Sequence, residues 1–172
     1  MIVILDYGMG NVGSILNMLK KIGADARISG DPEIINNADK IILPGVGAFD
    51  MGMTKLNEIG LVSVIREHTL VKKKPILGIC LGMQMLGRSS EEGEKEGLAL
   101  IPFDNVRFKF KDDIELKVPH MGWDRVIIEK KESPLLYGLD NNQRYYFVHS
   151  FHAVCDKTDN ILMTCDYGYD FA

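Results

Sequence analysis

Short apolar runs alternate with helical patterns over the first 80 residues, and this alternation constrains the fold more than any other feature of the sequence. Ile2 to Leu5 form the first run, and the apolar residues that follow it share one helical face: Val12, Ile15, Leu16, Leu19 and Ile22. Further strands are predicted at residues 26–28, 41–43 and 76–79, and helices from Asp31-Pro32 and over residues 61–72. Strands that alternate with helices form right-handed βαβ units and a largely parallel sheet.

The second half has a different sequence pattern, in which short β-rich segments separated by turn residues replace the helical patterns. These segments cover residues 106–110, 115–118, 125–128, 145–148 and 161–164. No polar or proline-rich linker separates the two halves, so residues 1–172 are expected to form one domain. The predicted architecture is α/β: a flavodoxin-like, mostly parallel central sheet flanked by helices, with an added antiparallel region in the second half.

Composition excludes several functional classes. The chain is 46% apolar and 26% charged, and it contains no apolar run near the ~18 residues that cross a membrane. Its start, Met1 to Asp6, lacks a basic leader, which predicts a cytoplasmic location. A formal charge of −4 without a basic stripe argues against nucleic acid as a partner. The spacing of Cys80, Cys155 and Cys165 predicts neither a disulfide framework nor a metal site, and no cofactor is expected.

The segment Gly78-Ile79-Cys80-Leu81-Gly82 places a cysteine between two glycines, where a predicted strand meets a plausible helix. A sharp strand-to-helix turn of this kind holds a nucleophile in a strained conformation and pushes it out of the sheet. The following helix directs backbone N–H groups and its positive dipole end at the sulfur, which favours the reactive thiolate. The alternative is that Cys80 is a buried small hydrophobe, and these five residues leave both interpretations open.

The longer string from Gly78 to Gln84, with the sequence GICLGMQ, resembles the nucleophile signature of class I glutamine amidotransferases. In that family the cysteine attacks the side-chain amide of glutamine, forms a glutamyl thioester and releases ammonia. The resemblance therefore implies that Cys80 is the nucleophile and that Gln84 helps to hold the substrate.

Leu43 to Phe49, with the sequence LPGVGAF, follows the third predicted strand. Its glycines either form an ordinary turn or let backbone N–H groups approach a developing oxyanion. Members of the family carry a P-G-x-G oxyanion strand at this place. The resemblance implies that the amides of Gly47 and Leu81 bind the oxyanion, that the Val46 peptide flips to complete the hole, and that Gly45 contacts the substrate.

Two later segments supply further implied substrate contacts. The string from Tyr145 to Phe151, YYFVHSF, is specific to the family, and the backbone groups of Ser150 and Phe151 would meet the α-carboxylate of glutamine. Glu92 matches the acid that binds the α-ammonium group. Otherwise the acidic stretch at residues 91–96 reads as a solvated surface loop.

The string Pro119-His120-Met121-Gly122-Trp123 holds the only tryptophan and resembles a motif of imidazole glycerol phosphate synthase amidotransferase subunits. There it lies at the interface with the cyclase subunit, a (β/α)8 barrel, so the resemblance implies a heterodimer with His120, Met121 and Trp123 at the contact. The glycine-rich turn that ends at Asn11 could be a phosphate nest. The family instead places this turn beside the oxyanion strand and near the partner, which gives Asn11 an ordering role.

The general base is the point at which the sequence departs from the family pattern. From chemistry alone, His149 is the first candidate among His68, His120, His149 and His152, with His68 in a predicted surface helix. The family instead takes its base and orienting acid from a His-x-Glu that follows a Y-G-x-x-F segment. That segment corresponds to residues 167–171, and no His-x-Glu is present. We therefore expect the domain to be C-terminally incomplete. Without the base, residues 1–172 alone are expected to hydrolyse little glutamine.

The function predicted from these features is a glutaminase subunit that passes ammonia to a cyclase partner, which makes imidazole glycerol phosphate in histidine biosynthesis. One alternative is a paralogous amidotransferase subunit for surface-sugar biosynthesis, suggested by His152, Cys155 and residues 167–171. The other is a binding subunit without catalysis, which the missing base would favour.

Overall fold

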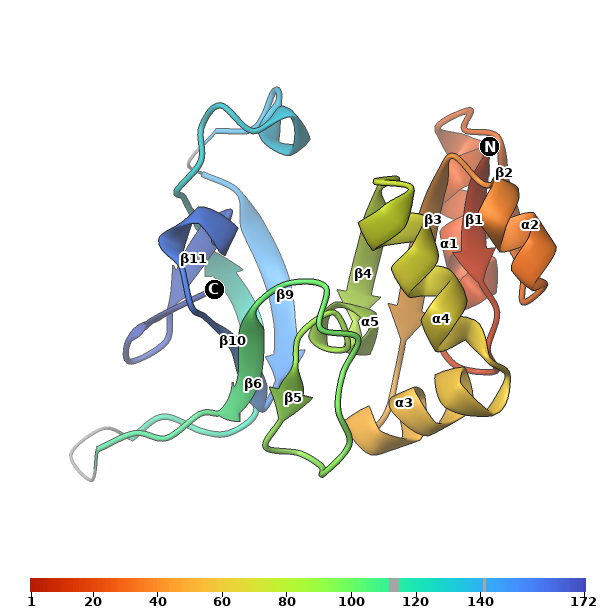
Figure 1. Cartoon of the computed structure of the whole chain (residues 1–172). Helices are drawn as coiled ribbons and strands as arrows, with labels where there is room; N and C mark the ends of the chain where they lie inside the picture. Colours follow the sequence, from red (N-terminus) through yellow and green to blue (C-terminus); the bar gives the residue numbers. More distant parts are fainter. Residues whose placement is uncertain (112–114, 141) are drawn as a thin grey trace.

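A four-stranded parallel sheet forms the centre of the first half (Figure 1). The computed structural model describes residues 1–111, 115–140 and 142–172. The strand order is β2-β1-β3-β4, and the strands are β1 (Ile2–Leu5), β2 (Ala26–Ser29), β3 (Lys40–Gly45) and β4 (Ile76–Cys80). The chain runs from β1 to β2 on one side and then returns past β1 to β3. In such a sheet the crevice at the carboxyl ends of the strands is the usual ligand site.

Helices lie on both faces of this sheet, with α1 on one face and α2 and α4 on the other (Figure 1). They are α1 (Val12–Lys21), α2 (Pro32–Asn37), α3 (Phe49–Glu58), α4 (Leu61–Arg66), the π-helical turn η1 (Glu67–Val71) and α5 (Leu81–Gln84). The sequence determines where two of them begin. The side chains of Asn11 and Asp31 accept backbone hydrogen bonds in the first turns of α1 and α2, as capping residues do.

The second half consists of short, mainly antiparallel strands beside the first sheet (Figure 1). One sheet has the order β10-β6-β5, another has the order β12-β11-β8, and β7 pairs with β9 as a two-stranded antiparallel ribbon. The bounds are β5 (Ser89–Ser90), β6 (Phe103–Arg107), β7 (His120–Arg125), β8 (Ile127–Ile128), β9 (Arg144–His149), β10 (Phe151–Cys155), β11 (Met163–Asp166) and β12 (Asp170–Phe171), with 3-10 turns η2 (Pro134–Leu136) and η3 (Thr158–Asn160).

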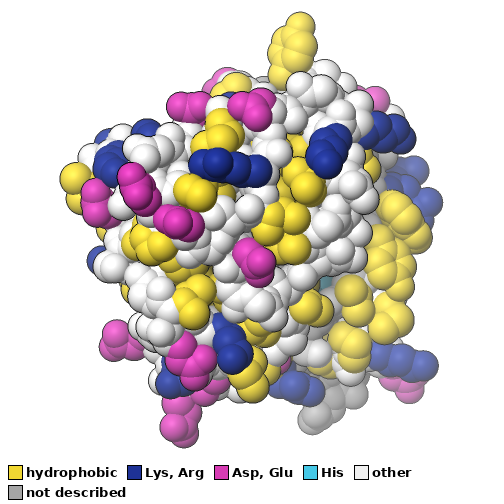
Figure 2. All heavy atoms as spheres, turned by 90° about the vertical axis from the view of Figure 1, so that its right-hand side faces the viewer, with side chains coloured by type: hydrophobic (Ala, Val, Ile, Leu, Met, Phe, Trp, Pro, Cys, Tyr) yellow, Lys and Arg dark blue, Asp and Glu magenta, His cyan; other side chains and the backbone are white. Residues whose placement is uncertain are grey.

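Two hydrophobic clusters hold these layers. The larger lies under the first sheet and includes Leu5, Leu43, Phe49 and Leu81, all buried. The smaller forms around Phe108 and Phe171 in the second half. Because Leu81 follows Cys80 directly, the main core anchors the residue beside the expected nucleophile. On the face that Figure 2 shows, basic and acidic side chains are interspersed.

The predicted α/β class, the parallel sheet and the antiparallel additions are confirmed. The strand predicted at residues 115–118 is wrong, because the backbone there forms no ladder. Helix α3 was not anticipated, since it contains the poor helix former Gly52 and begins after Ala48, whose side chain cannot cap it. Its missing cap comes from Glu92, 43 residues further on, which no local pattern reveals.

His68 is buried in η1 rather than on a surface helix, which corrects the expectation from its sequence. The side chain is 0% exposed, and neither ring nitrogen makes a hydrogen bond to the described residues. Burial lowers the pKa of His68, and the nearby Lys74 ammonium lowers it further. The folded protein therefore keeps this imidazole neutral.

Lowering the pH from 7 to 5 is expected to reduce the free energy of unfolding, in part through His68. Its pKa is lower in the folded than in the unfolded state, so stability present above the ordinary value of ~6.5 is lost as the pH falls below it. His68→Leu should flatten this dependence, measured by urea unfolding at both pH values. Burial also lowers the pKa values of His149 and His152, so these two residues should maintain part of the pH dependence in the variant. An unchanged pH dependence in the variant would exclude His68 as a contributor.

Candidate active site

Cys80 lies at a strained turn between β4 and α5. Its backbone has φ +56 and ψ −121, a conformation that costs a residue with a Cβ on the order of 1–3 kcal/mol and that clusters at functional sites. The side chain is exposed. The alternative of a buried hydrophobic cysteine is therefore wrong, and the geometry is that of a nucleophile presented at the end of a strand.

The glycine after Cys80 lets α5 lie directly against β3. A Cβ on Gly82 would stand 1.9 Å from the carbonyl oxygen of Leu43. On the same side, Gly45 is the register partner of Cys80 across the β3–β4 ladder. This close approach brings the end of β3 beside the sulfur, which is the position that an oxyanion strand needs.

The expected oxyanion residues occupy the two segments that meet at this point. Val46 and Gly47 follow β3, and Leu81 opens α5 behind β4. The Val46 side chain is exposed and Gly47 has φ +101, so no core packing fixes this peptide in one orientation. That Gly47 and Leu81 donate to an oxyanion, and that Val46 flips, stay predictions.

Tyr7 supports the end of β3 and was missed by the sequence analysis. Its hydroxyl donates a 2.6 Å hydrogen bond to the carbonyl oxygen of Pro44, in a buried position. Burial raises the pKa of Tyr7 well above its usual range, and the nearby Cys80 contributes in the same direction. Gly10 of the same turn packs against Pro44 and Gly45, as expected for a turn beside the oxyanion strand.

Two of the expected substrate residues are held by contacts from other segments. The carboxylate of Glu92 accepts a 2.9 Å hydrogen bond from the backbone N–H of Phe49. This carboxylate therefore lies at the start of α3, which follows the expected oxyanion segment in the sequence. Gln84 ends α5, and its carbonyl oxygen accepts a 2.9 Å hydrogen bond from the side-chain amide of Asn105. Asn105 is 1% exposed and also binds the carbonyl of Ser89. It therefore fixes the end of the nucleophile helix.

Ser150 lies between β9 and β10, and Phe151 is the first residue of β10; neighbouring residues fix the backbone of both. The carbonyl of Ser150 accepts a 3.0 Å hydrogen bond from the N–H of Phe108. The carbonyl of Phe151 accepts a 2.9 Å bond from Nδ1 of His149. The guanidinium of Arg107 lies 5.9 Å from the centre of the Phe151 ring. These contacts order the segment, whereas its binding to a carboxylate stays a prediction.

His149 is engaged in a hydrogen-bonded chain that ends on Asp124. Its Nε2 lies 3.1 Å from Nδ1 of His120, and Nε2 of His120 lies 2.7 Å from the carboxylate of Asp124. At the other end of the chain, Nδ1 of His149 contacts the carbonyl oxygen of Phe151. The chain therefore uses both ring nitrogens of each histidine.

Both nitrogens of His149 are therefore occupied, and the interpretation of this residue as the base for Cys80 is not supported. His152 contacts the hydroxyl of Tyr169 at 3.0 Å, and His68 is buried in η1. Within residues 1–111, 115–140 and 142–172, no hydrogen bond joins a histidine to the Cys80 sulfur.

The β7–β9 ribbon exposes an apolar face. Trp123 pairs with Tyr146 and Met121 pairs with Val148 across the ladder, and these four side chains are between 55% and 61% exposed. His120 points the other way and is buried. Of the three residues expected at a partner contact in this ribbon, Met121 and Trp123 have exposed side chains and His120 does not; their contact with a partner stays a prediction.

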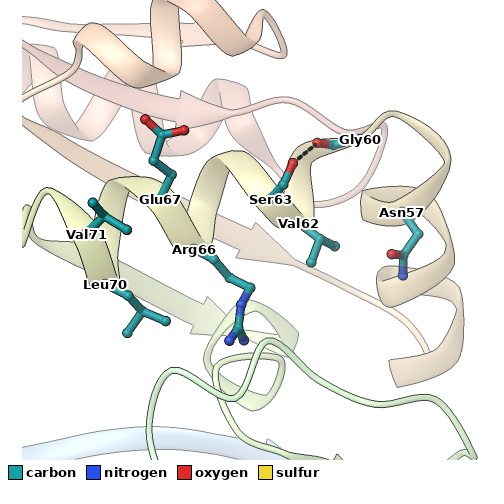
Figure 3. A pocket seen from close by; sticks show the side chains of 8 residues that line it. All are labelled: Asn57, Gly60, Val62, Ser63, Arg66, Glu67, Leu70 and Val71. Atoms are coloured by element: carbon teal, nitrogen blue, oxygen red, sulfur yellow. Dashed lines mark hydrogen bonds between the residues drawn. The ribbon is translucent and has the colours of Figure 1, made fainter.

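A groove of about 700 Å³ runs along α4 and η1, with Val62, Arg66 and Leu70 among its lining residues (Figure 3). None of the expected site residues lines it, so we assign it no part in the reaction. In the described part of the chain, no group of three or more His, Cys, Asp or Glu side chains could hold a metal ion. No helix there is long and apolar enough to cross a membrane.

Known proteins resemble this chain over almost its whole length. The family described as glutamine amidotransferase class-I matches residues 3–168. "Imidazole glycerol phosphate synthase subunit HisH 2" of Pseudomonas aeruginosa is 52% identical over 171 residues, which cover 99% of this chain and 83% of that relative. "Imidazole glycerol phosphate synthase subunit HisH" of Sulfurimonas denitrificans is 51% identical, over 99% of this chain and 82% of the relative.

Solved structures share the fold at low sequence identity. A crystal structure described as a glutamine amidotransferase superposes with a TM-score of 0.67 at 16% identity, over 96% of this chain and 85% of that one. The glutaminase domain of Trypanosoma brucei CTPS with bound acivicin gives a TM-score of 0.60 at 17% identity, over 96% and 75% of the two chains. The exposed nucleophile turn, the family match and the close relatives agree, and the chain belongs to the class-I glutamine amidotransferase family.

Proposed function

We propose that this protein is the glutaminase subunit of an imidazole glycerol phosphate synthase and acts in histidine biosynthesis. The observation that carries the proposal is the strained, exposed Cys80 at the β4–α5 turn beside the end of β3. Relatives that are more than 50% identical are named as subunits of this synthase. A (β/α)8-barrel cyclase as the partner and a cytoplasmic location belong to the same proposal.

In the proposed reaction, the Cys80 thiolate forms a bond to the amide carbon of glutamine, and the carbonyl electrons move onto oxygen. The N–H groups of Gly47 and Leu81 stabilise that oxyanion in a way that water cannot match, because they are already oriented. Collapse breaks the carbon–nitrogen bond, the nitrogen takes up a proton and leaves as ammonia, and the glutamyl thioester remains. Water then releases glutamate and restores the thiol.

The substrate's two charged ends define the remaining roles. Glu92 binds the α-ammonium group, and the Ser150–Phe151 backbone meets the α-carboxylate, so the amide is directed to Cys80. Gln84 adds a polar contact from the first turn after the nucleophile. Proton transfer needs a general base, but His120, His149 and His152 are hydrogen-bonded to other groups, and His68 is buried in η1. Glutamine hydrolysis is therefore best measured on the natural synthase complex. The reactivity of Cys80 is measured separately, by alkylation.

Replacing Trp123 with alanine is expected to weaken binding of the cyclase subunit by about 10-fold to 100-fold. The four-residue apolar face of the ribbon is the surface proposed to meet the partner, and a central aromatic side chain at an interface is worth ~2 kcal/mol or more. Tyr137→Ala is the matched control, because Tyr137 is 95% exposed but lies outside the ribbon. Titration calorimetry measures both. Equal affinities for the two variants would remove this face from the interface.

A further inference from the structure

We propose that Asp50 is a positioning residue for glutamine binding, because it holds the loop that carries Glu92 against the start of α3. This inference rests on the proposed function and deepens it. Asp50 touches no reacting atom, and its effect passes through the carboxylate of Glu92.

The start of α3 needs a cap from elsewhere in the chain. An α-helix leaves its first N–H groups without partners, and Ala48 at the N-cap makes no side-chain hydrogen bond. The carboxylate of Glu92 provides one, accepting from Phe49 N–H through Oε2 at 2.9 Å. Gly47 lies two residues before Phe49. The position of Glu92 is thus tied to the segment expected to bind the oxyanion.

Asp50 makes the reciprocal contact, from helix to loop. Its two carboxylate oxygens accept hydrogen bonds from the backbone N–H groups of Glu94 and Lys95, at 3.1 and 3.0 Å. These two bonds lower the pKa of Asp50, so it is ionised at neutral pH. Helix and loop are therefore joined in both directions, by Glu92 to Phe49 and by Asp50 to the two residues after Gly93.

The loop has no spare room against this carboxylate. A Cβ on Gly93 would stand 2.0 Å from Oδ1 of Asp50, so the backbone packs directly on the side chain. The loop is also anchored at its start, where the Glu92 N–H donates to the Ser90 hydroxyl at 3.2 Å. Asp50 thus fixes the loop on the far side of Glu92, and Ser90 fixes it on the near side.

This arrangement leaves Glu92 prepared for a cation. Within the described residues, Oε2 binds Phe49 and Oε1 makes no hydrogen bond. A carboxylate held at one oxygen offers the other to an ammonium group at little cost in conformational freedom. When Asp50 is removed, the loop loses two of the bonds that hold it, and Glu92 loses its fixed position. Binding of the substrate ammonium should weaken, while the reactivity of the Cys80 thiol should stay the same.

Two matched electrophiles test the inference on the protein with Cys80 intact. One is the chloroketone analogue of L-glutamine, and the other is the same chloroketone without the α-amino group. Cys80 displaces chloride from each and forms a stable thioether. Saturation of the alkylation rate gives a half-saturation concentration and a maximal rate for each reagent, so that binding is separated from thiol reactivity.

Asp50→Ala is expected to raise the half-saturation concentration about 10-fold for the amino reagent only, since a contact to a charged group commonly contributes this much. Asp50→Asn keeps one acceptor oxygen and should give an intermediate value, which covers the case of a poorly folded alanine variant. Glu92→Ala shows how much the half-saturation concentration for the amino reagent rises when the carboxylate itself is removed. Asp31→Ala is the control, because Asp31 also accepts two backbone N–H groups at a helix start but caps α2, and it should change neither reagent.

The results distinguish the possible failures. If Glu92→Ala loses its preference for the amino reagent while both Asp50 variants keep it, the role of Asp50 is overturned and the role of Glu92 stands. If Glu92→Ala keeps the preference, the assignment of Glu92 and the inference built on it both fail. If neither reagent labels Cys80 in the unmodified protein, the proposed glutaminase function itself fails.

Discussion

Replacing Cys80 with alanine is expected to abolish glutamine-dependent product formation by the natural synthase while leaving formation from added ammonium salts unchanged. The thioester cannot form without the sulfur, and loss of a catalytic nucleophile lowers turnover by at least about 10³-fold. In the proposed division of the reaction, the cyclase chemistry lies on the partner, so ammonia from solution should bypass the lesion. Both rates are measured on the same complex, with glutamine or with an ammonium salt at saturating concentration.

The other two cysteines provide internal controls for this experiment. Cys155 and Cys165 are partly or fully buried, and replacing either with alanine should leave the ratio of the two rates unchanged. Loss of both activities in the Cys80 variant would contradict the assignment of chemistry to two subunits. An unmodified complex that uses ammonium salts but never glutamine would support a binding subunit without catalysis.

Gly82→Ala is expected to destabilise the protein by about 3 kcal/mol or more and to abolish specific labelling of Cys80. The new Cβ would overlap the carbonyl oxygen of Leu43, which lies 1.9 Å from its position, and neither backbone segment can move without opening the β3–β4 ladder. Overpacking a site that cannot relax is among the mechanisms that produce the largest single-residue effects.

Gly13→Ala is the matched control, because Gly13 lies in α1 and a Cβ there would meet nothing within 4 Å. Alanine should stabilise that helix by about 0.5–1 kcal/mol. The free energy of unfolding, measured in urea, should be lower for the Gly82 variant and higher for the Gly13 variant than for the unmodified protein. A Gly82 variant as stable as the Gly13 variant would show that α5 does not sit on β3 as described.

The alternation of apolar runs and helical faces was sufficient to predict the first sheet, because its strands are short apolar runs and two of its helices, α1 and α2, carry local start signals. The β1 strand and the start of α1 are confirmed at the predicted residues, and the caps at Asn11 and Asp31 are local. The strand-to-helix turn at Cys80 also has a local signal, since its two flanking glycines and the strand before it are adjacent in sequence. That pattern alone left the exposure of the side chain open.

The contacts that organise the site were beyond such reasoning, because they join residues far apart in the sequence. Tyr7 reaches Pro44 across 37 residues, and Glu92 reaches Phe49 across 43. Tyrosine and glutamate are common surface residues, and nothing in their local sequence identifies a distant partner. The burial of His120 is likewise set by the pairing of β7 with β9, which places alternate residues on opposite faces of the ribbon.

Mapping the site of alkylation by the chloroketone analogue of glutamine tests the central claim most directly. The protein holds three cysteines, and burial raises the pKa of Cys155 and that of Cys165, the latter to about 11, so both are unreactive thiols at neutral pH. We predict that mass spectrometry of the digested protein finds a single adduct on Cys80 and that L-glutamine in excess slows its formation. Label on Cys155 or Cys165 instead, or no protection by glutamine, would contradict the assignment of Cys80 as the glutaminase nucleophile.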